Sequence, residues 1–362
     1  MVNLLLRQSR WILLVCAIVA APVALAQNLS DEWVRSMASP LVENNVVDGL
    51  SIGYIVGDVQ GVVHLGQTND AGQPPHDQTI YELGSISKVM TGILLADAVV
   101  REKIRLDANP NIPNAAGLRL PSLDQRSISW MDLSTHRSGL PRLPANLNVT
   151  SIKNPYSHYD SSKAATALAT RHLPRRPGQT HEYSNFAVSV LGYLIAENTG
   201  STYAELLQER IARPLGMVDC TIELSDEQRQ RFATPHRSIG SPTEAWDFAD
   251  MPGAGGVRAS IADMMRFANA QLQPPTGRIG EAIELAWEEH VASDASGNAM
   301  GLGWIIQADG ETRWHNGGTG GTRTMIMVNR ASRAAVIVLC NTRVQNEIDD
   351  LATRLLEKAA GG

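Results

Sequence analysis

The stretch Gly84-Ser85-Ile86-Ser87-Lys88 stands where a loop enters an apolar run that predicts a helix over residues 85–101. Ser85 and Lys88 are about one helical turn apart, so their side chains lie next to each other on one face. Burial lowers the pKa of a lysine, and a neutral Lys88 amine can take the proton of the Ser85 hydroxyl. The helix N-terminus adds a backbone N–H and a positive dipole end nearby. Because Ser-x-x-Lys also arises by chance around an N-cap serine, this interpretation needs support from other motifs.

A second candidate motif is Tyr183-Ser184-Asn185, which precedes an apolar helix predicted from Phe186. Tyr183, as a partly ionised phenolate, would relay protons between Ser85 and a leaving group. Asn185 would offer its amide to a substrate carbonyl. By itself the pattern is more typical of a helix cap with a packed tyrosine.

A third candidate motif is Trp314-His315-Asn316-Gly317-Gly318, at the end of a predicted strand. Glycines at a strand edge let a substrate backbone approach closely. The backbone N–H of Gly318 would pair with that of Ser85 to form an oxyanion hole. By itself the stretch is more typical of a flexible hairpin with a structural histidine.

The order and spacing of the three motifs resemble the serine β-lactamase and penicillin-binding protein superfamily, closest to the class C β-lactamases and the related D-alanyl-D-alanine carboxypeptidases and esterases. The resemblance extends to four more segments: Tyr81-Glu82-Leu83, Leu133-Ser134-Thr135-His136-Arg137-Ser138-Gly139-Leu140-Pro141, Pro214-Leu215-Gly216-Met217 and Gly255-Gly256. It covers nearly the whole chain after residue 26. It implies an antiparallel sheet flanked by helices, a helical domain beside the sheet, and a site between the two.

The resemblance also implies roles for particular residues. Ser85 would be the acylated nucleophile, Lys88 its proton acceptor, and Tyr183 the group that assists acylation and activates the deacylating water. His136 matches a position that is usually structural. The residues expected to bind substrate are Asn185, His315, Asn316, Gly317 and Gly318. We expect no metal and no cofactor, since the nine histidines of the sequence form no His-x-x-x-His or similar ligand pattern.

The sequence departs from the resemblance at His315, where class C β-lactamases usually carry lysine. Lysine is a permanent cation suited to the carboxylate of a β-lactam, whereas an unperturbed imidazole has a pKa of about 6.5. If His315 acts as a cation, anionic substrates should lose efficiency as the pH rises through that value. The leading interpretation is hydrolysis of an amide in a β-lactam or a D-amino-acid peptide, with a small-molecule or peptidoglycan-derived substrate. A carboxylesterase and a non-catalytic peptidoglycan-binding protein are the alternatives.

Strand patterns lie near both ends of the chain, over residues 51–58, 61–67, 301–307, 312–316, 322–329 and 333–341. Helices are predicted over residues 28–44, 161–171, 186–197, 260–273 and 347–359, the fourth with a capping box over residues 260–263. This arrangement predicts an α/β (α+β) fold with one sheet assembled from the two ends. Residues 27–105 and 250–362 would form the sheet part, and residues 106–249 an inserted, mainly helical part.

The chain has 362 residues and a net charge of -6, and it lacks a run of basic residues, so nucleic acid is not an expected partner. Arg7 and Arg10, the apolar residues 11–23 and Ala24-Leu25-Ala26 are typical of a signal peptide cleaved before Gln27. The expected location is then the periplasm or the medium, with no membrane anchor after cleavage. A retained anchor is the alternative, although the apolar run is short for a membrane span.

Export would allow Cys220 and Cys340 to pair. We expect two buried free thiols instead, because Cys340 follows the apolar run over residues 334–339, which reads as a central strand.

Overall fold

The computed structural model describes residues 29–147, 153–292 and 299–361. The predicted signal peptide lies outside these ranges. Within them, no helix combines the length and apolar character needed to cross a membrane.

The centre of the molecule is an antiparallel sheet in the order β2-β1-β13-β12-β11-β10-β9. Its strands are β1 (Gly49–Val56), β2 (Val59–Gly66), β9 (Ala299–Met300), β10 (Ile305–Ile306), β11 (Thr312–Gly318), β12 (Arg323–Asn329) and β13 (Ala334–Cys340). β1 pairs with β13 from Leu50 opposite Cys340 to Val56 opposite Ala334. The two ends of the chain therefore build one sheet, which confirms the predicted fold class.

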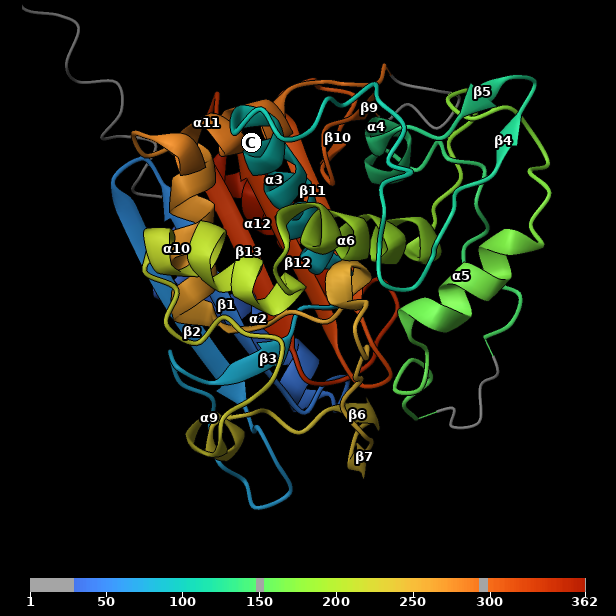
Figure 1. Ribbon diagram of the computed structural model, residues 1–362. Helices are drawn as coiled ribbons and strands as arrows, with labels where there is room; N and C mark the ends of the chain where they lie inside the picture. The colour runs from blue at the N-terminus through green and yellow to red at the C-terminus, as the bar shows by residue number, and fades with distance from the viewer. Residues whose placement is uncertain (1–28, 148–152, 293–298, 362) are drawn as a thin grey trace, which may run out of the picture.

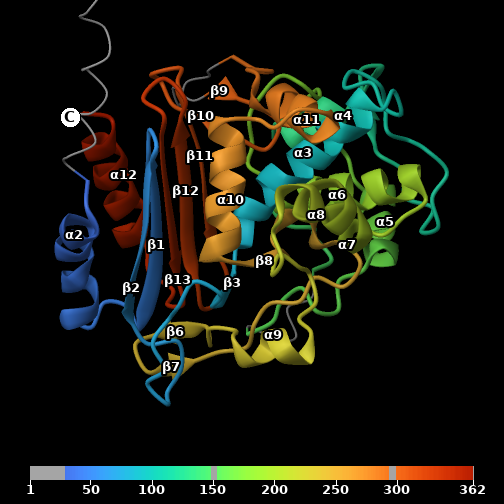
Figure 2. The ribbon, with the colours of Figure 1, turned by 90° about the vertical axis from the view of Figure 1, so that its left-hand side faces the viewer.

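Strand β13 shows why this sheet needs cover on both faces. All of its residues are buried, and alternate side chains enter two different cores. Val336 and Val338 face the outer core with α2 (Asp31–Glu43) and α12 (Glu347–Ala359). Ile337 and Leu339 face the inner core with α3 (Ser87–Val100), α10 (Ile261–Leu272) and α11 (Arg278–Trp287). Figure 2 shows the two helix layers on opposite sides of the strands.

The helical part lies on the inner side, beyond α3 (Figures 1 and 2). Its central element is α6 (Asn185–Thr199), whose buried face belongs to the inner core. In contact with it are α4 (Trp130–Ser134), α5 (Ser161–Ala169), α7 (Tyr203–Leu207) and the turn η4 (Pro252–Ala254). The π-helical η3 (Gln208–Ala212) packs on α3 and α7, and α8 (Arg213–Leu215) packs on η3 and α10. Helix α9 (Asp226–Gln230) lies apart from α6 (Figure 1). Short strand pairs are β3 (Ile80–Glu82) with β8 (Arg258–Ser260), β4 (Ser122–Leu123) with β5 (Arg126–Ser127), and β6 (His236–Ser238) with β7 (Ser241–Pro242).

Of the strand predicted over residues 301–307 only β10 forms, and the prediction is wrong for residues 301–304, which make the turn between β9 and β10. Gly303 in that turn has φ +76°, and a Cβ there would lie 2.2 Å from the Lys88 carbonyl oxygen. A Cβ on Gly92 would lie 2.0 Å from the Leu302 carbonyl oxygen. The segment is therefore shaped by its close packing on α3 and not by strand pairing.

The N-termini of two predicted helices differ from the prediction, one in its first residue and the other in its capping. Helix α2 begins at Asp31 because Ser30 is its N-cap and accepts a hydrogen bond from the Trp33 N–H. In α10, Ser260 caps the Asp263 N–H at 3.2 Å, but the Asp263 carboxylate accepts the Asp219 N–H at 2.9 Å. Only one half of the predicted capping box is therefore present.

Cys220 and Cys340 are buried and free. Burial raises the pKa of both thiols, so they are neutral packing groups at ordinary pH.

Candidate active site

Ser85 lies in a single 3-10 turn, η2 (Gly84–Ile86), that leads from β3 into α3. Gly84 has φ +53°, and a Cβ there would lie 2.5 Å from the Gly318 nitrogen. Thr324 of β12 donates its hydroxyl to the Leu83 carbonyl at 2.8 Å. The turn therefore packs closely against the end of β11, and the Gly318 N–H lies beside the turn that carries Ser85.

Lys88 follows one turn later and is 1% exposed. Its Nζ lies 2.9 Å from Ser85 Oγ and 2.7 Å from the Ala254 carbonyl oxygen. Burial, together with the positive charge of Arg142, holds the pKa of Lys88 well below its usual value. A neutral amine can donate to Ala254 and still direct its lone pair at the Ser85 hydroxyl, which is the state required of a general base.

Tyr183 approaches the same oxygen from the helical part, with its OH 2.8 Å from Ser85 Oγ. Burial raises the pKa of Tyr183, although the Ser85 hydrogen bond and the charges of Arg142 and Arg323 partly offset it. Tyr183 is therefore a neutral phenol in the free protein. The partly ionised phenolate expected from the sequence is not supported.

His136 fixes the segment that carries Tyr183. Its Nδ1 accepts the Ser184 N–H at 3.2 Å, and its carbonyl accepts the Glu182 N–H at 2.7 Å. Its ring packs on Tyr183, with 4.5 Å between ring centroids. Burial holds the pKa of His136 well below its usual value, so a neutral imidazole fills this position.

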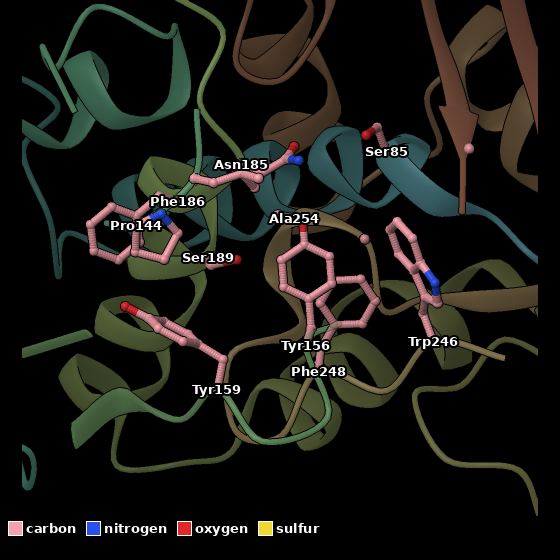
Figure 3. A pocket seen from close by; sticks show the side chains of 13 residues that line it. Ser85, Pro144, Tyr156, Tyr159, Asn185, Phe186, Ser189, Trp246, Phe248 and Ala254 are labelled. Carbon is pink, nitrogen blue, oxygen red and sulfur yellow. The ribbon is translucent and has the colours of Figure 1, made fainter. Parts of the chain in front are cut away.

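Asn185 is the first residue of α6, and Ser184 caps this helix by accepting the Ala187 N–H at 2.9 Å. Figure 3 shows its amide pointing from α6 towards Ser85. Its buried Oδ1 has no hydrogen-bond partner among the described residues. This orientation leaves a polar group available to a substrate.

His315 is close to Tyr183, with 6.3 Å between ring centroids, but it is only 1% exposed. Its Nδ1 lies 2.6 Å from the Asn316 carbonyl oxygen, which makes Nδ1 the protonated nitrogen. The buried Nε2 has no partner among the described residues. Burial, together with Lys88, lowers the pKa of His315 to about 3. A cationic His315 near neutral pH is therefore not supported.

The other residues of the third motif, Asn316, Gly317 and Gly318, make contacts on different faces of β11. Asn316 donates its side-chain amide to Asp349 of α12 at 2.6 Å, so only its backbone is on the side of Ser85. A Cβ on Gly317 would lie 2.0 Å from the Leu83 carbonyl oxygen, so Gly317 permits the contact between β11 and the nucleophile turn. Gly318 lines the cleft itself.

An aromatic pocket adjoins Ser85, and none of the sequence motifs predicts it. It contains about 450 Å³ of space, part of it open to solvent. Tyr156 stacks on Phe248 with 4.9 Å between centroids, and Trp246 lies 5.3 Å from Tyr156 (Figure 3). The lining residues are Ser85, Leu143, Pro144, Tyr156, Tyr159, Asn185, Phe186, Ser189, Trp246, Phe248, Ala254, Gly255 and Gly318. The available signal was Trp246-Asp247-Phe248, an aromatic pair in an otherwise polar stretch.

A second serine, histidine and aspartate are hydrogen-bonded in series away from this cleft. Ser51 Oγ lies 2.9 Å from His64 Nδ1, and His64 Nε2 lies 2.9 Å from Asp77 Oδ1. Ser51 is fully buried and also bonds Tyr81, so a substrate does not reach it. Among the described residues, no group of three histidine, cysteine or acidic side chains could hold a metal ion.

A serine hydroxyl between a neutral lysine and a tyrosine, beside backbone N–H groups, is the arrangement of a serine acyl-hydrolase. The family model described as Beta-lactamase matches residues 34–361. The chain therefore belongs to the β-lactamase family and is an enzyme of the serine hydrolase class.

Particular relatives agree with this assignment. The D-alanyl-D-alanine-carboxypeptidase/endopeptidase AmpH of Escherichia coli (strain K12) is 27% identical, over 94% of each chain. The β-lactamase/D-alanine carboxypeptidase of Pseudomonas syringae shares the fold with a TM-score of 0.77 at 21% identity, over 93% of this chain and 99% of that one. The class C β-lactamase of Rhodobacter sphaeroides has a TM-score of 0.75 at 21% identity, over 90% of this chain and 98% of that one.

Proposed function

We propose that this enzyme hydrolyses an amide bond in a β-lactam or a D-amino-acid peptide through an acyl-enzyme on Ser85. The observation that carries the proposal is the position of Ser85 Oγ, 2.9 Å from Lys88 Nζ and 2.8 Å from Tyr183 OH. Two groups that can each exchange a proton thus meet at one nucleophile. The substrate class is supported by the similarity to AmpH, a D-alanyl-D-alanine-carboxypeptidase/endopeptidase, and to the β-lactamase/D-alanine carboxypeptidase of Pseudomonas syringae.

In the acylation step, Ser85 Oγ forms a bond to the substrate carbonyl carbon while its proton passes to Lys88 Nζ. The carbonyl oxygen becomes an oxyanion, which accepts from the Ser85 and Gly318 N–H groups. The tetrahedral intermediate collapses when the C–N bond breaks, and the leaving nitrogen takes a proton relayed from Lys88 through the neutral Tyr183 hydroxyl. Water then attacks the ester by the same route and returns free Ser85 and the acid.

A carboxylesterase is the second candidate, and the state of His315 favours it. The pKa of His315 is lowered to about 3, so the third motif supplies no cation for a substrate carboxylate near neutral pH. The aromatic pocket beside Ser85 suits an apolar acyl group. An ester with an uncharged alcohol needs neither a cation nor strong leaving-group protonation.

The test compares kcat/KM for a chromogenic cephalosporin, a D-alanyl-D-alanine peptide and a short-chain p-nitrophenyl ester, with intact-mass analysis after an activated phosphonate. We expect one adduct, mapped to Ser85, and no turnover by Ser85→Ala. An adduct on another serine, or normal turnover by Ser85→Ala, would refute the mechanism. Absence of both adduct and turnover would favour the non-catalytic alternative.

We also propose that residues 1–26 are removed during export, so that the enzyme acts in the periplasm or outside the cell. The mature enzyme would then be one β-lactamase-related domain over residues 27–362, with a sheet part and the helical part at residues 106–249. N-terminal sequencing of the secreted protein tests this directly, and a mature N-terminus at Gln27 is the expected result.

A further inference from the structure

Glu82 is a buried carboxylate that the mechanism above does not use. It ends β3, three residues before Ser85, and is 2% exposed. In the β3–β8 pair it stands opposite Arg258. Burying a carboxylate costs free energy unless hydrogen-bond donors or a cation compensate for the lost water.

The two oxygens of Glu82 join segments that are distant in the sequence. Oε1 accepts the Trp246 N–H at 2.6 Å, and Trp246 forms one wall of the aromatic pocket. Oε2 accepts the Thr319 hydroxyl at 2.8 Å, and Thr319 directly follows Gly318. One side chain therefore connects the nucleophile turn, the pocket wall and the end of β11.

Arg258 holds the other side of the same pocket wall. Its Nη2 donates to the Trp246 carbonyl at 2.9 Å and to Asp247 Oδ1 at 3.1 Å. The backbone of Trp246 is thus held at its N–H by Glu82 and at its carbonyl by Arg258. These two residues face each other across β3 and β8, so the pocket wall is attached to the strand that leads to Ser85.

We propose that Glu82 is a positioning residue that holds Trp246 against the pocket and thereby selects bulky, apolar acyl groups over small ones. This inference rests on the proposed acylation of Ser85. A small acyl group such as acetyl reacts without filling the pocket, so it is insensitive to the position of Trp246. An arylacetyl group places its ring in the pocket, so its reaction depends on the position of Trp246 in the pocket wall.

The proton on Glu82 provides a readout that a purely structural role would not change. Burial raises the pKa of Glu82 to about 7, although the Trp246 and Thr319 hydrogen bonds and Arg258 partly offset it. The charged groups that face Glu82 are Arg258 and Asp247. A carboxylate accepts a stronger hydrogen bond than a carboxylic acid. The hold on Trp246 therefore weakens as the pH falls through about 7.

The experiment measures kcat/KM of the full-length enzyme for p-nitrophenyl phenylacetate and p-nitrophenyl acetate between pH 5.5 and 8.5. Both esters use the same Ser85, Lys88 and Tyr183, so their ratio cancels the ionisations of these groups. We expect the phenylacetate-to-acetate ratio of the wild type to fall about three- to ten-fold from the high to the low end of this range.

Glu82→Gln keeps the shape and can still accept the Trp246 N–H at its amide oxygen, but it carries no charge, and its amide nitrogen donates to Thr319 where Glu82 accepts. Its ratio should therefore be low and constant with pH. Asp263→Asn is the matched control, because Asp263 is also fully buried with its pKa raised by burial, to about 6, and lies outside the pocket lining. Its ratio should follow the wild type. A constant wild-type ratio, or a Glu82→Gln ratio that follows the wild type, would overturn the role of Glu82. If the wild type turns over neither ester although the phosphonate labels Ser85, the selection of apolar acyl groups is overturned and the acylation of Ser85 stands. If Ser85 also takes no phosphonate adduct, the proposed function is refuted, and the role of Glu82 with it.

Discussion

At the scale of single residues, the proton states around Ser85 decide what the site can do. Lys88 is enclosed and hydrogen-bonded to the Ala254 carbonyl, and burial holds its pKa well below the usual value. Tyr183 has its pKa raised by burial. Both groups are therefore uncharged in the free enzyme, which are the states that the proposed mechanism requires of its base, Lys88, and its proton relay, Tyr183.

Lys88→Arg replaces the neutral amine with a guanidinium cation that cannot give up its proton. We expect acylation of Ser85 to fall about 10²- to 10⁴-fold, the usual contribution of a general base. In the wild type, acylation should also fall as the pH drops below the lowered pKa of Lys88. Phosphonate labelling rates followed by mass spectrometry give the measurement, and Lys163→Arg at an exposed helix position is the matched control. Near-normal acylation in Lys88→Arg would assign the base to Tyr183.

His315 should not make substrate choice depend on pH near neutrality. Since its pKa is lowered to about 3, it stays neutral from pH 5 to 8. We expect the ratio of kcat/KM for an anionic cephalosporin to that for a neutral ester to be constant over this range. A ratio that falls as the pH rises through about 6.5 would show that substrate binding makes His315 a cation.

The same burial predicts how His315 affects stability. In the unfolded chain His315 binds a proton below about 6.5, but in the folded enzyme only near pH 3. The unfolded state therefore binds more protons, and the free energy of unfolding decreases as the pH falls between these values. The contribution is about 1.4 kcal/mol per pH unit. Denaturant unfolding from pH 7 to 4 should give a shallower slope for His315→Asn than for the wild type, and equal slopes would contradict the neutral state.

At the scale of elements, the contact between η2 and β11 places the two N–H groups of the proposed oxyanion hole, those of Ser85 and Gly318, next to each other. Gly84→Ala would add a Cβ 2.5 Å from the Gly318 nitrogen at φ +53°. We expect this to displace one N–H donor and to lower kcat about 10²- to 10³-fold. Gly57→Ala is the matched control, since Gly57 has φ +59° and nothing within 4 Å of an added Cβ. Equal losses of kcat in both variants would mean that backbone strain, and not the contact, is responsible.

Sequence patterns predicted the elements whose causes are local. Ser85 and Lys88 are adjacent because they are one helical turn apart. The apolar residues of β13 require packing partners on both faces of the strand, whichever elements supply them. Residues 301–304 were misassigned because the packing of Gly303 on α3 is a long-range effect. The direction of the Asn316 side chain depends on which face of β11 meets α12.

The pocket wall was missed for the same reason, because Tyr156, Trp246 and Phe248 come together only through the tertiary fold. The charge of His315 likewise depends on enclosure by elements that are remote in the sequence. Residue types and spacing thus predicted the serine hydrolase class, while the proton states and the shape of the pocket required the packed structure.

At the scale of the whole molecule, the sheet separates two cores that have different consequences for function. The inner core contains α3 and α6, which carry the groups around Ser85. The outer core joins β1, β12 and β13 to α2 and α12. Side chains of the outer core should therefore contribute to folding without shaping the cleft.

Leu355→Ala tests this separation, since Leu355 is a fully buried residue of α12 in the outer core. Loss of its buried methyl groups and the cavity left behind should reduce the free energy of unfolding by about 2–5 kcal/mol. Because the cavity lies on the face of the sheet away from Ser85, we expect kcat/KM per folded molecule to stay within two-fold of the wild type. Denaturant unfolding gives the first quantity, and active-site titration with a phosphonate corrects the second for unfolded protein. A loss of kcat/KM as large as that of Gly84→Ala would mean that the sheet transmits outer-core packing to the active site.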